Sequence, residues 1–221
     1  MDKLVILSGG LDSTTLLYFV KNQYPDEVIG TITFDYDQKH KREIQSAIQT
    51  CVKLMVPIQI FSMKAFSSLA PSALTTEETK VPEGHYQEDS MRATVVPNRN
   101  MVFLSLAIAY AVGKGASKVY MGVHSGDHSI YPDCRPEFIT AMRQASVLCD
   151  WKPILIEAPF LKLDKTQIVK LGTGLGVDYS LTQTCYNGRD KACGKCGSCV
   201  ERLESFSKNG IKDPLEYEDA S

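Results

Sequence analysis

The fold is decided by residues 4–20, LVILSGGLDSTTLLYFV, in which an apolar strand, a glycine turn and an apolar helix follow one another directly. We expect the helix to begin near Asp12 or Ser13. Glycine lets the backbone adopt positive φ and approach a ligand closely. The unpaired N–H groups at a helix N-terminus attract anions. The turn therefore predicts a phosphate-binding loop, and a tight turn without a ligand is the alternative.

The loop lacks the spacing of the two common nucleotide signatures, G-x-x-x-x-G-K-[ST] and G-x-G-x-x-G. Its string over residues 8–13 resembles the pyrophosphate loop of the ATP pyrophosphatase superfamily, whose members split ATP between the α and β phosphates. The resemblance implies that the loop holds the β,γ-pyrophosphate while AMP is transferred to a substrate oxygen. The implied nucleotide-binding residues of this segment are Leu7, Ser8, Gly9, Gly10, Leu11, Asp12, Ser13, Thr14, Thr15, Leu16 and Leu17.

Composition is that of an ordinary globular domain: 43% of the 221 residues are hydrophobic and 23% are charged. The formal net charge of −2 argues against a protein whose main task is to bind nucleic acid. The first residues are expected to form a strand, so we expect no signal peptide. The longest apolar stretch, Met101–Val112, is too short for a membrane span and predicts a buried helix. We therefore expect a cytoplasmic protein without a membrane or nucleic-acid partner.

Strand and helix patterns alternate along the chain, which predicts an α/β fold: a Rossmann-like, doubly wound parallel sheet of the adenine-nucleotide hydrolase kind. Residues 1–180 are expected to form this domain, and residues 181–221 a small helical, zinc-binding appendage. Ligands of such sheets bind at the carboxyl ends of the strands. The expected strands are Lys3–Leu7, Glu27–Phe34, Pro57–Ser62, Lys118–Gly122 and Pro153–Ile156, and the expected helices are about Ser13–Gln23, Lys41–Met55, Asn100–Lys114, Pro136–Asp150, Lys165–Leu171 and Val200–Lys208.

Two segments break the alternation. Lys64–Thr94 is polar and rich in turns, and such a long connection is usually a lid, a partner contact or disordered. The acidic end, Glu216–Asp219, is expected to be a solvated tail.

Four of the seven cysteines are clustered, which predicts a metal site. In a reducing compartment close thiols persist better as metal ligands than as disulfides. Four thiolates suit tetrahedral Zn²⁺ and leave no open position for water, so the site is expected to be structural. An iron–sulfur cluster and unrelated thiols are the alternatives. Cys51 and Cys149 lie in apolar, helix-like segments and are expected to be buried. The clustered residues are Cys185, Cys193, Cys196 and Cys199.

Polar side chains also follow the second strand and precede the most apolar helix. Gln38 and His40 offer hydrogen bonds to a ligand, with Lys39 or Arg42 as a nearby charge; a polar loop that caps a helix is the alternative. Before the apolar helix, Asn98 or Asn100 could simply be an N-cap, which is the alternative to a functional motif there. Arg99 stands near the same helix start, where the dipole does not favour a cation. Its guanidinium would instead suit a phosphate or a carboxylate.

Residues 122–138 are the densest polar segment, GVHSGDHSIYPDCRPEF, and predict a pocket for a polar, planar substrate. Asp133 and Arg135 could bind hydrogen-bonding edges, and Tyr131 or Phe138 could stack. Cys134 could be a nucleophile, although the sequence assigns it no partner base. An ordinary connecting loop is the alternative.

Five motifs in one order carry a more specific resemblance: the pyrophosphate loop, Tyr36-x-Gln38-Lys39-His40, Val96-Pro97-x-Arg99-Asn100, Tyr131–Arg135, and Cys185-Tyr186-x-Gly188 with the other clustered cysteines. Together they resemble the 7-cyano-7-deazaguanine synthase family from Leu4 to about Arg202. Ile130 stands where many members have glycine, and His128 where an aromatic residue is frequent; both affect the shape of the pocket.

The resemblance implies a reaction. The substrates would be 7-carboxy-7-deazaguanine, ammonia and ATP. Adenylation of the carboxylate gives a good leaving group, ammonia then gives an amide, and a second adenylation lets the amide lose its oxygen to form a nitrile. Free ammonium is favoured over delivery by a partner, because the family pattern already occupies the chain and leaves no room for an amidotransferase domain.

The resemblance also implies roles for residues and an assembly. The expected catalytic residues are Asp12, which would contact Mg²⁺, and Ser13, Asp133 and Arg135. Residues 32–34 would border adenine, and one Zn²⁺ per chain and a homodimer are expected. Arg99 and Lys165 would contact phosphate or carboxylate, an ordinary solvated lysine being the alternative for Lys165. The expected substrate-binding residues are Gln38, His40, Tyr131, Asp133 and Arg135.

Two other functions compete with this prediction. A tRNA-thiolating or lysidine-forming enzyme shares the adenylating loop, but the chain shows no obvious RNA-binding appendage. A non-catalytic nucleotide- or zinc-dependent interaction protein is the second. Turnover with the acid, with tRNA or with neither discriminates among the three.

Overall fold

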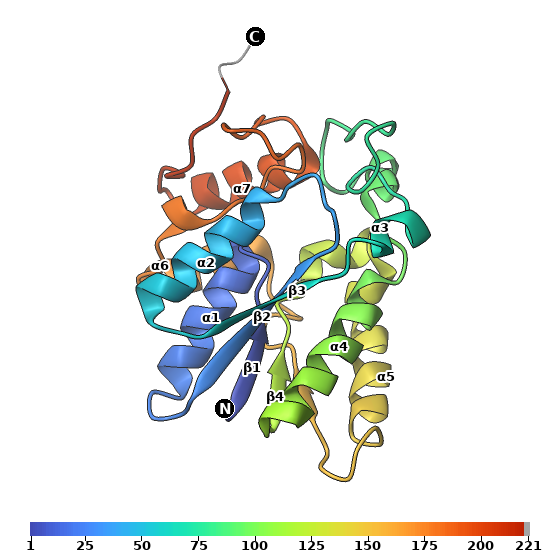
Figure 1. The fold of residues 1–221 in the computed structure, drawn as a ribbon. Coiled ribbons are helices and arrows are strands. Elements are labelled where there is room, and N and C mark those ends of the chain that lie inside the picture. Colours follow the sequence, from blue (N-terminus) through green and yellow to red (C-terminus); the bar gives the residue numbers. More distant parts are fainter. Residues whose placement is uncertain (219–221) are drawn as a thin grey trace.

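The computed structural model describes residues 1–218. Its centre is a five-stranded, fully parallel sheet in the order β3-β2-β1-β4-β5 (Figure 1). The doubly wound α/β fold predicted from the sequence is confirmed. The strands are β1 (Lys3–Ile6), β2 (Ile29–Asp35), β3 (Ile58–Ser62), β4 (Lys118–Tyr120) and β5 (Leu155–Glu157).

Helices cover both faces of the sheet because alternate residues of each strand point to opposite sides. Leu4 and Ile6 of β1 join the core under α4 and α5, whereas Val5 joins the core under α1, α2 and α6. Figure 1 shows these two groups of helices on opposite sides of the strands. The helices are α1 (Leu11–Gln23), α2 (Arg42–Leu54), α3 (Phe66–Leu69), α4 (Arg99–Lys114), α5 (Pro136–Ser146), α6 (Lys165–Gly174) and α7 (Gly197–Lys208).

The chain changes direction across the sheet next to β1. It runs from β1 outward through β2 to β3, and then returns to β4 on the other side of β1. The loops after β1 and β4 therefore part from each other, which leaves a crevice at the carboxyl ends of the strands. The short 3₁₀ helices η2 (Ser125–Ser129) and η3 (Pro132–Cys134) follow β4 at this edge.

Helix α4 is the most apolar element and lies in the core as predicted, with Phe103, Leu104 and Ala107 buried. Together with the 3₁₀ helix η1 (Asp89–Thr94), it belongs to a stretch, residues 89–114, that is long and apolar enough to cross a membrane by length and composition. A core helix meets the same criterion, so this stretch is weak grounds for a membrane span.

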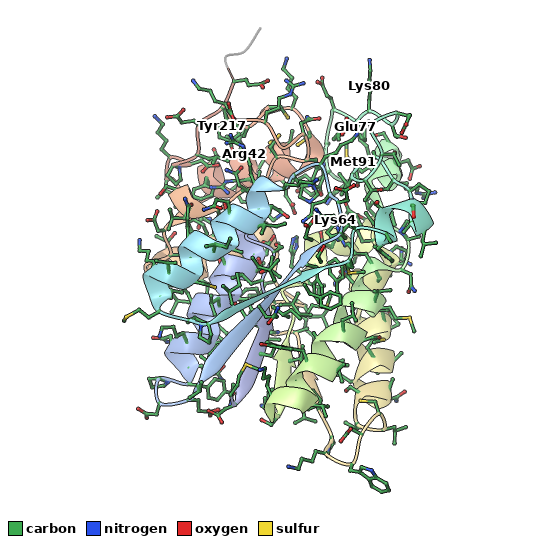
Figure 2. All side chains as sticks on the ribbon, in the orientation of Figure 1. Arg42, Lys64, Glu77, Lys80, Met91 and Tyr217 are labelled. Atoms are coloured by element: carbon green, nitrogen blue, oxygen red, sulfur yellow. The ribbon has the colours of Figure 1, made fainter. Side chains whose placement is uncertain are left out.

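The 64–94 segment is packed against the C-terminal part of the chain. Gly84 N–H donates to the Lys195 carbonyl, and Met91 is 2% exposed beside Gly197. In Figure 2, Lys64, Glu77, Lys80 and Met91 mark this segment above the sheet.

Three sequence expectations were wrong in detail. Cys149 is exposed because α5 ends at Ser146, three residues before it. Helix α7 begins at Gly197 rather than Val200, so Cys199 lies in its first turn. The acidic end is not a free tail over its described part, because Ala192 exchanges backbone hydrogen bonds with Glu216 and Glu218. Asp219 lies outside the described residues.

Candidate functional site

A cavity of about 220 Å³ lies at the carboxyl ends of β1, β2 and β4. Residues from the loops after these strands line it, together with the starts of α1 and α4. The wall is completed by Lys165, the first residue of α6, and by the C-terminal residues Gln183, Thr184, Tyr186, Ser198 and Glu201. The cavity therefore occupies the crevice predicted from the alternation of strands and helices.

The glycine turn is built to bring backbone close to the cavity. Gly9 has φ +94°, and a Cβ at this position would collide with the Glu43 carbonyl oxygen of α2. Ser13 Oγ accepts the N–H groups of Ser8 (3.1 Å) and Gly9 (3.3 Å) and lies 3.0 Å from Ser8 Oγ. The serine thus shapes the loop, and the first-turn N–H groups of α1 remain as donors for an anion.

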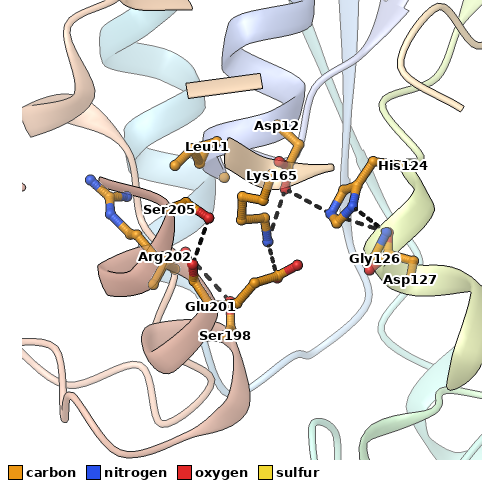
Figure 3. A network of polar contacts seen from close by, with 12 residues as sticks. Leu11, Asp12, His124, Gly126, Asp127, Lys165, Ser198, Glu201, Arg202 and Ser205 are labelled. Atoms are coloured by element: carbon orange, nitrogen blue, oxygen red, sulfur yellow. Dashed lines mark hydrogen bonds and ion pairs between the residues drawn. The ribbon is translucent and has the colours of Figure 1, made fainter. Parts of the chain in front are cut away.

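A charged cluster of five side chains stands beside this loop (Figure 3). Lys165 Nζ is ion-paired with Glu201 and lies 3.5 Å from Asp12 Oδ2. His124 Nε2 lies 3.7 Å from the same Asp12 oxygen and 3.6 Å from Asp127 Oδ2. His124 Nδ1 accepts the Gly126 N–H (3.1 Å), so the ring proton belongs on Nε2, between the two carboxylates.

Lys165 is 7% exposed, which excludes the solvated-lysine alternative. Burial alone would lower the pKa of Lys165, but the carboxylates of Asp12 and Glu201 outweigh it and hold that pKa above its ordinary value. Asp12 Oδ1 is buried and has no hydrogen-bond partner among residues 1–218. Asp12 and Glu201 contact the Lys165 ammonium group and Asp127 acts on it by charge, so the carboxylates outnumber the ammonium group and Asp12 suits a further cation.

Aromatic side chains form the other end of the cavity, with Arg99 among them. The hydroxyls of Tyr131 and Tyr186 lie 3.1 Å apart, and Arg99 Nη1 donates to the Tyr36 hydroxyl (3.5 Å). Burial would lower the pKa of Arg99, but Tyr36 and Asp133 reverse this and raise it. Among the described residues no carboxylate lies within 4.0 Å of Arg99, so its charge is available to an anion in the cavity.

His40 and Glu43 connect the two ends. His40 Nε2 lies 3.3 Å from Glu43 Oε2. Burial lowers the pKa of His40 to about 3, and Arg99 adds to the effect. Burial raises the pKa of Glu43 to about 8, against the opposing charge of Arg99. Near neutral pH this contact therefore joins a neutral imidazole to a largely protonated carboxyl group.

Several residues predicted for the site do not line the cavity. The Asp133 carboxylate accepts the backbone N–H of Asn100 (3.0 Å) and so caps α4, a task that the side chain of Asn98, at the N-cap position, does not perform. Arg135 is exposed and donates to the His128 carbonyl (2.8 Å). Thr14 to Leu17 are buried within α1. The placement of these residues gives no support to direct contacts with a ligand.

Gln38 and Cys134 do line the cavity but have other partners. Gln38 accepts the Tyr36 N–H (3.0 Å) and donates to the Phe34 carbonyl (3.2 Å), so it shapes the exit of β2. Asn100 Nδ2 donates to Cys134 Sγ (3.2 Å). Burial, reinforced by Asp127 and Asp133, raises the pKa of the Cys134 thiol well above its ordinary value. The thiol is therefore not activated as a nucleophile.

Sequence reasoning missed the residues that adjoin its motifs. Glu43 lies three positions after His40, about one helical turn, which places it near a motif residue. Glu201 lies two positions after Cys199, a spacing that turns the two side chains to different faces of the helix, so the motif gives no such signal for Glu201. A search for carboxylates one helical turn beyond each motif would have found Glu43. His124 and Asp127 belonged to the segment that was singled out, but were given no role there.

The four clustered cysteines form a candidate metal centre. All four are buried, and their sulfurs lie within 4.8 Å of one another. The Cys193 and Cys199 sulfurs are 4.0 Å apart, close to the ~3.8 Å that tetrahedral Zn–S bonds of about 2.3 Å require. The N–H groups of Lys195 and Cys196 point at the Cys193 sulfur (3.5 and 3.3 Å), which stabilises a thiolate. The donor set fits a tetrahedral, thiolate-binding metal.

Solved structures share the fold at low sequence identity. NMN synthetase from Francisella tularensis matches 96% of this chain and 78% of its own, with a TM-score of 0.53 at 15% identity. A predicted subunit of a tRNA methyltransferase from Methanocaldococcus jannaschii matches 99% of this chain and 92% of its own, with a TM-score of 0.52, also at 15% identity. At such identity the likeness concerns the fold alone.

Closer relatives share the sequence over nearly its whole length. The 7-cyano-7-deazaguanine synthase of Methanoregula boonei is 55% identical over 218 residues, 99% of this chain and 100% of the relative. The 7-cyano-7-deazaguanine synthase of Caldicellulosiruptor saccharolyticus is 56% identical over 99% of this chain and 96% of the relative. The profile of the family described as queuosine biosynthesis protein QueC matches residues 2–210. The chain therefore belongs to the QueC family.

Proposed function

We propose that this chain is an ATP-dependent ligase that converts 7-carboxy-7-deazaguanine and ammonia into 7-cyano-7-deazaguanine, within queuosine biosynthesis. The activity is that named for relatives at 55% and 56% identity. The observation in the structure that supports it best is a single cavity in which a phosphate-type loop faces an unpaired arginine among aromatic rings.

The loop end activates an oxygen. The first-turn N–H groups of α1 and the ammonium group of Lys165 suit the β,γ-phosphates of ATP. The unpartnered Asp12 Oδ1 fits a Mg²⁺ ion, since a carboxylate oxygen is its preferred protein ligand. Mg²⁺ would offset the charge that develops on the phosphates as AMP is transferred.

The aromatic end holds the acid. A bidentate guanidinium–carboxylate pair with Arg99 would place the carboxylate of the substrate toward the loop. The rings of Tyr36, Tyr131 and Tyr186 offer stacking surfaces to a planar heterocycle. Of the residues predicted for substrate, Tyr131 keeps this role in our proposal. His40 contacts Glu43, and Gln38, Asp133 and Arg135 act on local structure.

The cysteine cluster would hold one Zn²⁺ per chain as a structural ion. All four ligands come from the protein, so no position is left for a reacting water. Tyr186 follows Cys185 directly, and Glu201 lies two residues after Cys199. The metal would therefore fix the segment that supplies side chains to both ends of the cavity.

The decisive assay mixes the protein, Mg²⁺ and ATP with 7-carboxy-7-deazaguanine and ammonium, and follows pyrophosphate, AMP and the nitrile. We expect two ATP consumed for each nitrile formed. Turnover with tRNA in place of the acid would instead indicate a tRNA-modifying enzyme. Nucleotide binding without turnover would indicate a non-catalytic protein. The expected homodimer is tested by light scattering of the purified chain.

A further inference from the structure

The carboxyl group of Glu43 has one oxygen engaged and one free. Oε2 lies 3.3 Å from His40 Nε2. Oε1 lies beside Gly10 of the phosphate loop, 3.4 Å from where a Cβ of that glycine would stand, and receives no hydrogen bond from the described residues. The side chain is 17% exposed and lines the cavity. The free oxygen is therefore accessible to a ligand beside the loop.

The position of this carboxyl group is fixed by its surroundings. Glu43 lies in the first turn of α2, and its backbone carbonyl packs against Gly9, which has no Cβ in the way. His40 is 5% exposed, and its Nδ1 is buried and finds no hydrogen-bond partner in the described part of the chain. Within that part, Glu43 is the polar contact of the ring. The ring therefore serves to hold the carboxyl group.

Both stages of the proposed reaction release protons where the two ends of the cavity meet. Ammonium must lose a proton before its nitrogen can attack the acyl-adenylate. An amide activated on oxygen must lose its last N–H proton before it becomes a nitrile. Lys165 is held charged and Arg99 cannot act as a base. The carboxylates of Asp12 and Glu201 face the Lys165 ammonium group, and that of Asp127 faces His124, so none of them is the free acceptor where the two ends meet.

We propose that Glu43 is the general base of this site, with His40 as the residue that positions it. This inference rests on the proposed function. In the first stage ammonium gives one proton to Glu43 Oε1, and the freed lone pair forms the C–N bond while the C–O bond to AMP breaks with its electrons on AMP. The phosphate of the released AMP takes the second proton from the nitrogen, which leaves the neutral amide. In the second, the last N–H proton goes to Oε1, its electron pair becomes the third C–N bond, and AMP leaves again.

The charges around Glu43 suit this task. The titratable and charged groups around Glu43 are Asp12 on α1, Arg99 on α4, and Tyr36 and His40 in the segment after β2. Asp12 and Arg99 act on the Glu43 carboxyl group by charge. Burial together with Asp12 outweighs Arg99 and raises the pKa of Glu43 to about 8. A general base is most effective when its pKa lies near the working pH. The accepting carboxylate becomes the major form as pH rises through about 8, so the turnover number should rise over the same interval.

The test compares Glu43→Gln with Glu43→Asp and with Glu137→Gln, an exposed position on α5. The turnover number is measured from pH 6 to 9.5 with saturating acid, ammonium and ATP, and again with the amide as substrate. We expect Glu43→Gln to lose at least about 100-fold in both assays, with no rise near pH 8. Its KM for MgATP and its melting temperature should not change. Glu43→Asp should keep the rise, and Glu137→Gln should match the unchanged protein.

The inference is overturned if Glu43→Gln retains the rise near pH 8 or a turnover number within threefold of the unchanged protein. It is equally overturned if the loss appears only as a raised KM for MgATP, because Glu43 would then be a metal or nucleotide contact. Failure of the unchanged protein to turn over either the acid or the amide would instead contradict the proposed function.

Discussion

The two ends of the cavity are held in place by different forces. At the loop end, the charges of Asp12, Lys165 and Glu201 hold these side chains together, and the His124 ring lies beside Asp12. At the aromatic end, rings and hydroxyls surround the single charge of Arg99. In our proposal the loop end receives the phosphates of ATP, which are charged and the same in every turnover, and the aromatic end receives the acid.

The two ends also differ in how far apart their residues lie along the chain. Residues 7–13, which form the loop, are contiguous, and a strand, a turn and a helix start are enough to shape them. The aromatic end takes Tyr36 from the exit of β2, Tyr131 from the exit of β4 and Tyr186 from the cysteine segment. Substitutions that act on one end, on both or on neither can therefore test the distinction.

The largest effect is expected from Cys196→Ala, which removes a ligand of the cluster that supports both ends. A structural zinc site contributes up to about 10 kcal/mol to folding on the scale of small zinc domains. We expect no bound zinc by elemental analysis and a melting temperature lowered by well over 10 °C. Cys149→Ala, an exposed cysteine outside the cluster, is the control. Normal stability without metal would contradict a structural role.

Asp12→Asn should act on the loop end alone. It removes the charge that faces Lys165 and the oxygen that suits Mg²⁺, while the side chain keeps its size. We expect a loss of about 10²–10³-fold in the turnover number for pyrophosphate release, in line with the loss of one electrostatic stabiliser. Circular dichroism should show a folded protein, and Asp26→Asn, at an exposed turn, should be unaffected. Full activity of Asp12→Asn would refute the assignment of the loop.

Arg99→Gln should act on the aromatic end alone. The side chain loses the charge and the fork that suit the carboxylate of the acid. We expect the KM for the acid to rise about 10–100-fold, while the KM for ATP changes little. Arg92→Gln, an exposed arginine shortly before α4, is the matched control. An equal rise in the KM for ATP would show that Arg99 binds phosphate, and the two ends would then share one ligand.

The sequence was most informative where neighbouring residues determine the structure. The sheet, the loop at residues 8–13 and the cysteine cluster follow from local pattern, and the fold is confirmed. The sequence was least informative where side chains meet across the sheet. Asp133 looked like a substrate contact, because nothing in its neighbourhood shows that α4 begins within reach of its carboxylate. The pairing of Lys165 with Glu201 joins α6 to α7 and is equally hidden.

Tyr186→Phe should have the smallest effect and gives the finest test of the aromatic end. It removes one hydroxyl of the Tyr131–Tyr186 pair but leaves the ring in place. A single neutral hydrogen bond contributes about 0.5–1.5 kcal/mol, so we expect a two- to tenfold change in the turnover number with the acid. Tyr110→Phe, on α4 at the core, is the control. If the loss exceeds that of Arg99→Gln, the hydroxyl pair rather than the charge positions the acid, and the two ends differ less in kind than the structure indicates.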